Sequence, residues 1–129
     1  MKNRPRPVFL NPLQIRLPIA GIMSIVHRIS GVLMVLAIPV LIWSLEHSLS
    51  GPDDFVHMRS LLQTPIGQLG LSLTLWILIH HLLSGIRFLL IDIDLGVNKP
   101  AYRITAFLVL IGSPTMAYLL MTEMLGIVL

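Results

Sequence analysis

One long apolar stretch carries most of the side chains in this chain that could do chemistry. It is residues 76–92, WILIHHLLSGIRFLLID. Ionisable groups at mid-bilayer cost roughly 2.5–3.5 kcal/mol each, so they usually face protein, a cofactor or water. At about 3.6 residues per turn, one stripe of this helix collects His81, Ser84, Gly85, Phe88 and Asp92. Because Gly85 lets a flat, bulky ligand approach the backbone, we predict that this stripe faces a haem and that His81 ligates its iron.

Alternatives remain for both histidines of the pair. His81 could hydrogen-bond to a neighbouring helix without binding a ligand. His80 points about 100° away from His81, so both cannot easily serve one iron. We assign His80 to packing or polar contact, with ligation as its alternative.

A second cluster precedes the first along the chain. Ser24, His27, Arg28 and Gly31 follow the i, i+3, i+4, i+7 spacing of one helix face. An arginine one turn from a serine could bind a quinone carbonyl, because its charge would stabilise the negative charge that develops there on reduction. Arg28 could instead be a snorkelling surface residue. His27 could be a second axial ligand, but we favour a place beside a haem propionate.

Two further charged residues have open roles. Arg87 could hold a haem propionate or anchor the helix at the membrane interface. Asp92 lies on the His81 stripe, where it could pair with Arg28 or Arg87, relay protons, or serve as a structural helix-end residue.

The elements that must position these residues are membrane spans. The chain has 129 residues, of which 55% are hydrophobic and 12% charged, and its mean hydropathy is +0.87. Soluble domains carry about 25% charged residues. The apolar runs 21–45, 66–91 and 104–129 each exceed the ~20 residues that cross a bilayer. We predict an all-α membrane protein with three transmembrane helices, forming one membrane-anchor domain over residues 1–129, with residues 1–20 as its entry segment.

This composition also excludes several functions. The spans leave no room for a soluble catalytic domain, so any soluble machinery must lie on other chains. The absence of cysteine excludes disulfides and thiolate-ligated iron–sulfur clusters. The net charge of +3 does not indicate nucleic-acid binding, because the basic residues sit mainly at membrane borders.

Charge asymmetry predicts the orientation. The loop after the first span offers one basic residue against three acidic ones, whereas the entry segment carries four basic residues and the second loop carries two. Positive-inside counting therefore puts the N-terminus in the cytoplasm and the C-terminus outside. The N-terminal segment fits neither a secretory signal nor a mitochondrial presequence, so we expect a bacterial inner membrane. The basic residues counted are Lys2, Arg4, Arg6, Arg16, Arg59, Lys99 and Arg103.

Proline and polar residues predict further local features. Pro18 is placed to begin the first helix, and Pro39 to bend it. The external loop is expected to contain one short helical turn around residues 55–62. His47 and His57 fall on the opposite side of the membrane from Arg28, outside the predicted site. Small residues in the third span suggest close packing against a partner.

Two motifs resemble those of the large membrane-anchor subunit of succinate dehydrogenase, a cytochrome b family. The first is Arg6-Pro7-Val8 followed by residues 24–31, SIVHRISG. The second is residues 81–92, HLLSGIRFLLID, an H-x-x-x-G-x-R pattern ending in Asp. Length, spans and topology also fit. Within the family a small residue usually stands where this chain has Asp94.

The resemblance implies a non-catalytic anchor of respiratory complex II. His81 would be an axial ligand of haem b, with the other ligand from a small anchor subunit. Ser24 and Arg28 would take quinone-site roles, and His27 and Arg28 would lie near the propionates. A flavoprotein and an iron–sulfur subunit would deliver electrons to ubiquinone. The alternatives are an anchor of fumarate reductase or another quinone-linked dehydrogenase, and a cofactor-free structural anchor.

Overall fold

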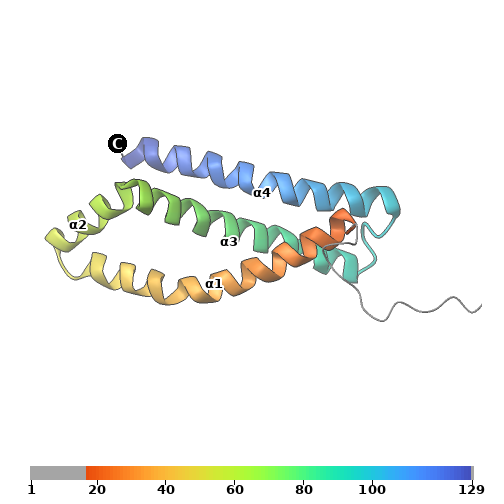
Figure 1. The fold of residues 1–129 in the computed structure, drawn as a ribbon, viewed down its shortest axis with the longest axis horizontal. Helices are drawn as coiled ribbons and strands as arrows, with labels where there is room; N and C mark the ends of the chain where they lie inside the picture. Colours follow the sequence, from red (N-terminus) through yellow and green to blue (C-terminus); the bar gives the residue numbers. More distant parts are fainter. Residues whose placement is uncertain (1–16, 129) are drawn as a thin grey trace, which may run out of the picture.

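Four helices make up the part of the chain that the computed structural model describes, residues 17–128, with side chains described as far as residue 124. They are α1 (Ile19–Leu49), α2 (Pro52–Gln63), α3 (Pro65–Asp92) and α4 (Lys99–Val128), and no strand occurs among them. α1, α3 and α4 lie side by side in alternating directions, and α2 joins α1 to α3 at one end (Figure 1). The predicted all-α class is confirmed. Residues 1–16, with most of the predicted entry segment, lie outside the described part.

Three of these helices are long and apolar enough to cross a membrane: Ile19–Leu49, Pro65–Asp92 and Lys99–Met124. This confirms the three predicted spans. In the most apolar 18-residue stretch of α1 only 6% of the residues are buried. In the corresponding stretches of α3 and α4 the buried share is 28%. α1 therefore leaves most of its apolar surface for lipid or for another chain.

Proline sets the beginning and the course of α1. Pro18 caps the helix with an extended backbone, and its carbonyl accepts from the amides of Gly21 and Ile22. Pro39 lies inside the helix and has no amide hydrogen for the preceding turn. The helix curves along its length (Figure 1).

The segment between α1 and α3 is more regular than predicted. Where the sequence suggested one short turn, α2 is a helix of 12 residues. Pro52 occupies its first turn, where a missing amide hydrogen costs nothing. Asp53 and Asp54 also lie there, and their charges favour the positive end of the helix dipole. With these start signals the helix begins three residues before the expected turn.

A tight corner joins α2 to α3. The Thr64 hydroxyl accepts from the Gly67 amide at 3.1 Å and caps α3. A Cβ at Gly67 would overlap the Leu61 carbonyl oxygen and lie 2.8 Å from the Leu62 Cα. Only glycine allows the two helices to meet this closely.

Asp94 ends α3 in a left-handed conformation, with φ of 62°. Its amide donates to the Ile91 carbonyl, and the Leu95 amide donates to the Leu90 carbonyl. These two bonds form the capping pattern that usually employs glycine, and aspartate is among the few other residues that tolerate this conformation. Asp94 thus supplies the backbone turn after α3, although the resemblance led us to expect a small residue there.

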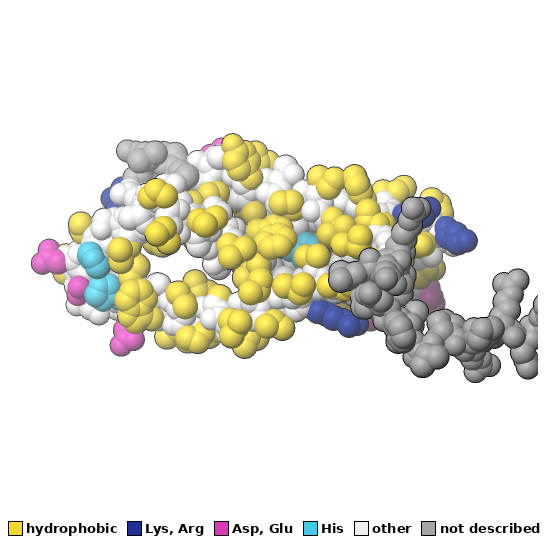
Figure 2. Space-filling view, in the orientation of Figure 1, with side chains coloured by type: hydrophobic (Ala, Val, Ile, Leu, Met, Phe, Trp, Pro, Cys, Tyr) yellow, Lys and Arg dark blue, Asp and Glu magenta, His cyan; other side chains and the backbone are white. Residues whose placement is uncertain are grey.

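The two ends of the bundle differ. Near the start of α1, Met23 packs against Ala106 and Val109 of α4 in a buried core. At the other end the four helices leave an apolar groove of about 630 Å³, lined among others by Met58 of α2 and Met121 of α4, and the visible face is hollowed there (Figure 2).

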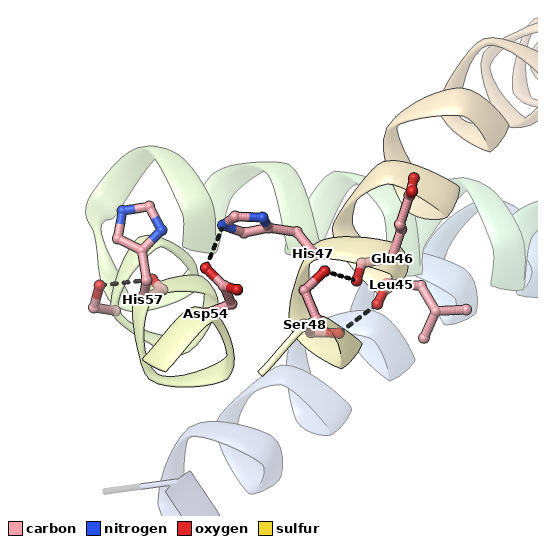
Figure 3. A network of polar contacts seen from close by, with 8 residues as sticks. Leu45, Glu46, His47, Ser48, Asp54 and His57 are labelled. Carbon is pink, nitrogen blue, oxygen red and sulfur yellow. Dashed lines mark hydrogen bonds and ion pairs between the residues drawn. The ribbon is translucent and has the colours of Figure 1, made fainter. Parts of the chain in front are cut away.

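A polar cluster lies at the α1–α2 corner (Figure 3). His47 Nε2 is 3.7 Å from Asp54 Oδ1, and the rings of His47 and His57 meet edge to face. The corner is 19 residues along α1 from Arg28, or about 28 Å at 1.5 Å per residue. As predicted, these histidines are remote from the cluster at the start of α1.

A buried polar contact ties α3 to α4. His80 and Ser113 are both fully buried, and His80 Nδ1 lies 3.0 Å from Ser113 Oγ. The opposite ring nitrogen, His80 Nε2, lies 3.2 Å from Ser84 Oγ. Both nitrogens thus have partners, and the assignment of His80 to polar contact agrees with this placement.

We expect Ser113→Ala to lower the free energy of unfolding by about 1–2 kcal/mol, because it leaves a buried ring nitrogen of His80 without its partner. Thermal denaturation of the protein purified in detergent measures the loss. Thr115→Ala is the matched control, since the exposed Thr115 hydroxyl bonds only to the Ile111 carbonyl of its own helix. Equal losses in the two variants would contradict a role for the contact between helices.

Candidate functional site

His81 lies on α3 where this helix approaches α1. Its ring is half-buried. The Nδ1 atom lies 3.1 Å from Ser30 Oγ and 3.2 Å from the His27 carbonyl oxygen. Ser30 is buried, and its hydroxyl donates to the same carbonyl at 2.7 Å. One edge of the imidazole is therefore held by α1.

Gly31 makes this close approach possible. A Cβ at this position would lie 2.9 Å from His81 Cε1 and 3.4 Å from Nδ1, which is too close for the ring to stay where it is. An apolar groove of about 320 Å³ runs between α1 and α3, and both Gly31 and His81 line it. Its other lining residues include Met34, Ile38 and Ile77. His81 thus lines an apolar groove that could hold part of a flat ligand.

His27 stacks on His81. The ring centroids are 4.2 Å apart with planes inclined by 19°, and the centroid of the Phe88 ring lies 5.2 Å from that of His27. The Nε2 atom of His27 is buried and has no hydrogen-bond partner among the described residues. Gly85 faces it, since a Cβ there would lie 3.9 Å from Nε2. Stacked rings do not place two nitrogens on opposite sides of one iron.

Ser84 does not share the His81 site, so this part of the predicted stripe was wrong. Its hydroxyl lies beside His80, on the α4 side of the helix. The helix geometry gives the reason: at about 100° per residue, Ser84 is roughly 40° from His80 but 60° from His81. The nearer histidine also offers the buried hydrogen bond. Gly85 and Phe88, by contrast, do lie beside the stacked pair.

Arg87 connects α3 to the beginning of α4. Its Nε donates to Thr105 Oγ1 at 3.0 Å, and its Nη2 donates to the Tyr102 carbonyl at 2.9 Å. The side chain is only 6% exposed. Because its Nε and Nη2 atoms both donate to α4, Arg87 ties two helices together rather than anchoring α3 at the membrane interface. Its binding of a propionate stays a prediction.

Asp92 is exposed at the last residue of α3. It forms an ion pair with neither Arg28 nor Arg87 in the described structure, which includes all three side chains. The suggested pairing is thus absent, and a proton-relay role stays a prediction.

Ser24 and Arg28 lie one turn apart near the start of α1. Ser24 is half-buried and Arg28 exposed. Within residues 17–128 neither side chain has a hydrogen-bond or ion-pair partner, whereas other α1 serines bond to carbonyls of the preceding turn. A hydroxyl and a cation without partners among the described residues are suited to bind a polar ligand.

Sequence reasoning gave Ser30 no role, although the residue contacts the predicted iron ligand. A signal for it exists in the spacing: Ser30 follows His27 by three residues and directly precedes Gly31. It therefore had to lie on the same helix face as the histidine and beside the glycine that allows close approach.

Comparisons with known proteins find relatives over most of the chain. The family described as succinate dehydrogenase/fumarate reductase transmembrane subunit matches residues 2–120. The succinate dehydrogenase cytochrome b556 subunit of Coxiella burnetii is 32% identical over 115 residues, covering 86% of this chain and 90% of that protein. The subunits of the same name from Paracoccus denitrificans and Rickettsia conorii are 33% and 31% identical, covering 91% and 79% of this chain and 88% and 79% of theirs.

We expect Gly31→Ala to lower the free energy of unfolding by about 1–3 kcal/mol, because the new methyl group would displace the His81 ring from its contact with α1. Thermal denaturation in detergent measures this. The control is Gly70→Ala on α3, where no heavy atom lies within 4 Å of the added Cβ, and where alanine favours the helix by up to about 1 kcal/mol. Gly31→Ala melting at or above the temperature of Gly70→Ala would refute the steric argument.

Proposed function

This chain belongs to the family of succinate dehydrogenase/fumarate reductase transmembrane subunits, and we propose that it binds haem b through His81 and forms part of a ubiquinone-reduction site through Ser24 and Arg28. The predicted family and the role as a membrane anchor are confirmed. As such a subunit, it works in a complex with other chains of the enzyme. The cytochrome b name of its relatives supports a haem cofactor.

The described residues fit a haem. His81 is held against α1 at an apolar groove, and the buried Nε2 of His27 has no partner within the described residues, as expected where a bound group completes the site. Within residues 17–128, no three His, Cys, Asp or Glu side chains gather as a metal site. A single histidine suits an iron already held by a macrocycle. When bound, haem supplies a one-electron carrier.

Three residues would hold this group from the present chain. His81 would ligate the iron. The observation that carries this proposal is that the Nδ1 atom of His81 is occupied by contacts with α1. His27 and Arg28 would bind the propionates. Because His27 stacks on His81, the second axial ligand would come from another chain, for which we propose the small anchor subunit.

A quinone would bind at the start of α1. The Arg28 guanidinium and the Ser24 hydroxyl have no partners in the described residues and lie one turn apart. A positive charge beside a quinone carbonyl stabilises the negative charge that reduction places on its oxygen. We propose ubiquinone as the substrate, with electrons delivered by the iron–sulfur subunit from a flavoprotein that oxidises succinate. Operation in the reverse direction, as a fumarate reductase, is the second candidate, because the family includes both enzymes.

We propose the bacterial inner membrane as the location, with the N-terminus cytoplasmic and the C-terminus periplasmic. Charge supports this orientation: Lys99 and Arg103 begin α4 at the same end of the bundle as the start of α1, whereas Asp53 and Asp54 lie at the other end. The exposed apolar face of α1 would contact the small anchor subunit and membrane lipids.

His81→Ala is expected to remove the haem or change its spectrum strongly, because the iron loses an axial ligand. A dithionite-reduced minus oxidised absorption spectrum of the purified complex measures this. His80→Gln is the neighbouring control, since an amide can replace the ring as partner of Ser113. An unchanged haem spectrum in His81→Ala would exclude His81 as the ligand.

Arg28→Ala is expected to lower succinate–quinone reductase activity about 10- to 100-fold, because the quinone oxygen loses its charged partner. Succinate oxidation with an artificial soluble acceptor should stay near the wild-type rate. Arg103→Ala, which removes another exposed cation near the same end of the bundle, is the matched control. Equal losses in both assays for Arg28→Ala would argue against a quinone site there.

A further inference from the structure

We propose that Ser30 is a positioning residue for His81: together with the His27 carbonyl it fixes the imidazole in the Nδ1–H tautomer, and so leaves the Nε2 lone pair for the iron. This inference rests on the proposed function, in which His81 is the haem ligand. It adds a residue of α1 to a site whose metal-binding atom belongs to α3.

The tautomer follows from the atoms around Nδ1. The His27 carbonyl oxygen, 3.2 Å away, can only accept a hydrogen bond. The Ser30 hydroxyl, 3.1 Å away, has its own hydrogen on that same carbonyl, so its oxygen also presents a lone pair to the ring. Two acceptors meet Nδ1, which therefore carries the proton. In a neutral imidazole the opposite nitrogen then has the free lone pair.

Burial makes the other tautomer costly. Ser30 is 1% exposed and lies in a membrane-spanning helix, where water is not available to replace a lost partner. With the proton on Nε2, the lone pair of Nδ1 would face the carbonyl oxygen of His27, and two acceptors would lie in contact. The Ser30 hydroxyl could relieve this only by giving up its own bond to that carbonyl.

Contacts on the ring faces fix its orientation as well. His27 stacks on the ring, and the missing side chain of Gly31 leaves room for Cε1. Rotation of the imidazole about its bond to the Cβ atom would therefore break the contacts of Nδ1. Three features of α1 within residues 27–31 thus act on one imidazole: the carbonyl of residue 27, the hydroxyl of residue 30 and the space at residue 31.

Hydrogen bonds at Nδ1 also affect the metal. An acceptor on the distal N–H of a ligating histidine makes the ring a stronger electron donor and favours the oxidised metal. Removing the Ser30 hydroxyl takes away one of two acceptors. The midpoint potential of the haem should then shift upward, while His81 remains the ligand through its bond to the carbonyl.

The test is redox titration of the haem in the complete purified complex. Ser30→Ala should retain haem and shift its midpoint potential upward. Ser44→Ala should match the wild type, because Ser44 lies on the same helix and makes the same kind of bond, to the Val40 carbonyl, away from His27 and His81. If Ser30→Ala does not assemble, Ser30→Cys keeps the volume but replaces the oxygen by a weak acceptor, and should shift the potential in the same direction.

The outcomes separate this inference from the proposed function. A wild-type potential in an assembled Ser30 variant overturns the positioning role, even if His81→Ala removes the haem. An unchanged haem in His81→Ala overturns the ligand assignment itself. An upward shift in the Ser30 variant, together with haem loss in His81→Ala, supports both.

Discussion

The structure depends on two adjacent histidines that reach from the central helix to different neighbours. His80 contacts Ser113 of α4, and His81 contacts the His27 carbonyl and Ser30 of α1. Successive residues of a helix point about 100° apart, so one pair can reach two helices. Within a membrane, polar groups must find partners inside the protein. These contacts therefore fix the rotation of α3 about its axis and its position against α1 and α4.

Small residues let the helices come close enough for those contacts. Gly31 leaves room for the His81 ring, and Gly67 lets α3 turn sharply from α2. Arg87 adds a tie from α3 to the beginning of α4. The same close approach that packs the bundle also brings His27 against His81, so packing and ligand positioning share one set of residues.

The chain supplies one side of its proposed site. α1 buries little of its apolar surface, its Arg28 and Ser24 lack partners in the described residues, and the Nε2 atom of His27 is buried without one. Unsatisfied polar groups beside an exposed apolar face are expected where a ligand and another subunit complete the structure. In our proposal these are haem b, ubiquinone and the small anchor subunit.

The sequence by itself determined the three spans, the family and the two motifs, because hydropathy and residue spacing are local properties of the chain. Only the tertiary structure decided which partner each polar side chain takes. It turned Ser84 toward His80, committed Arg87 to α4 and brought Ser30 to His81. The reason is physical: a stripe on a single helix defines directions, but a hydrogen bond requires the rotation and closeness of two helices, which their packing sets.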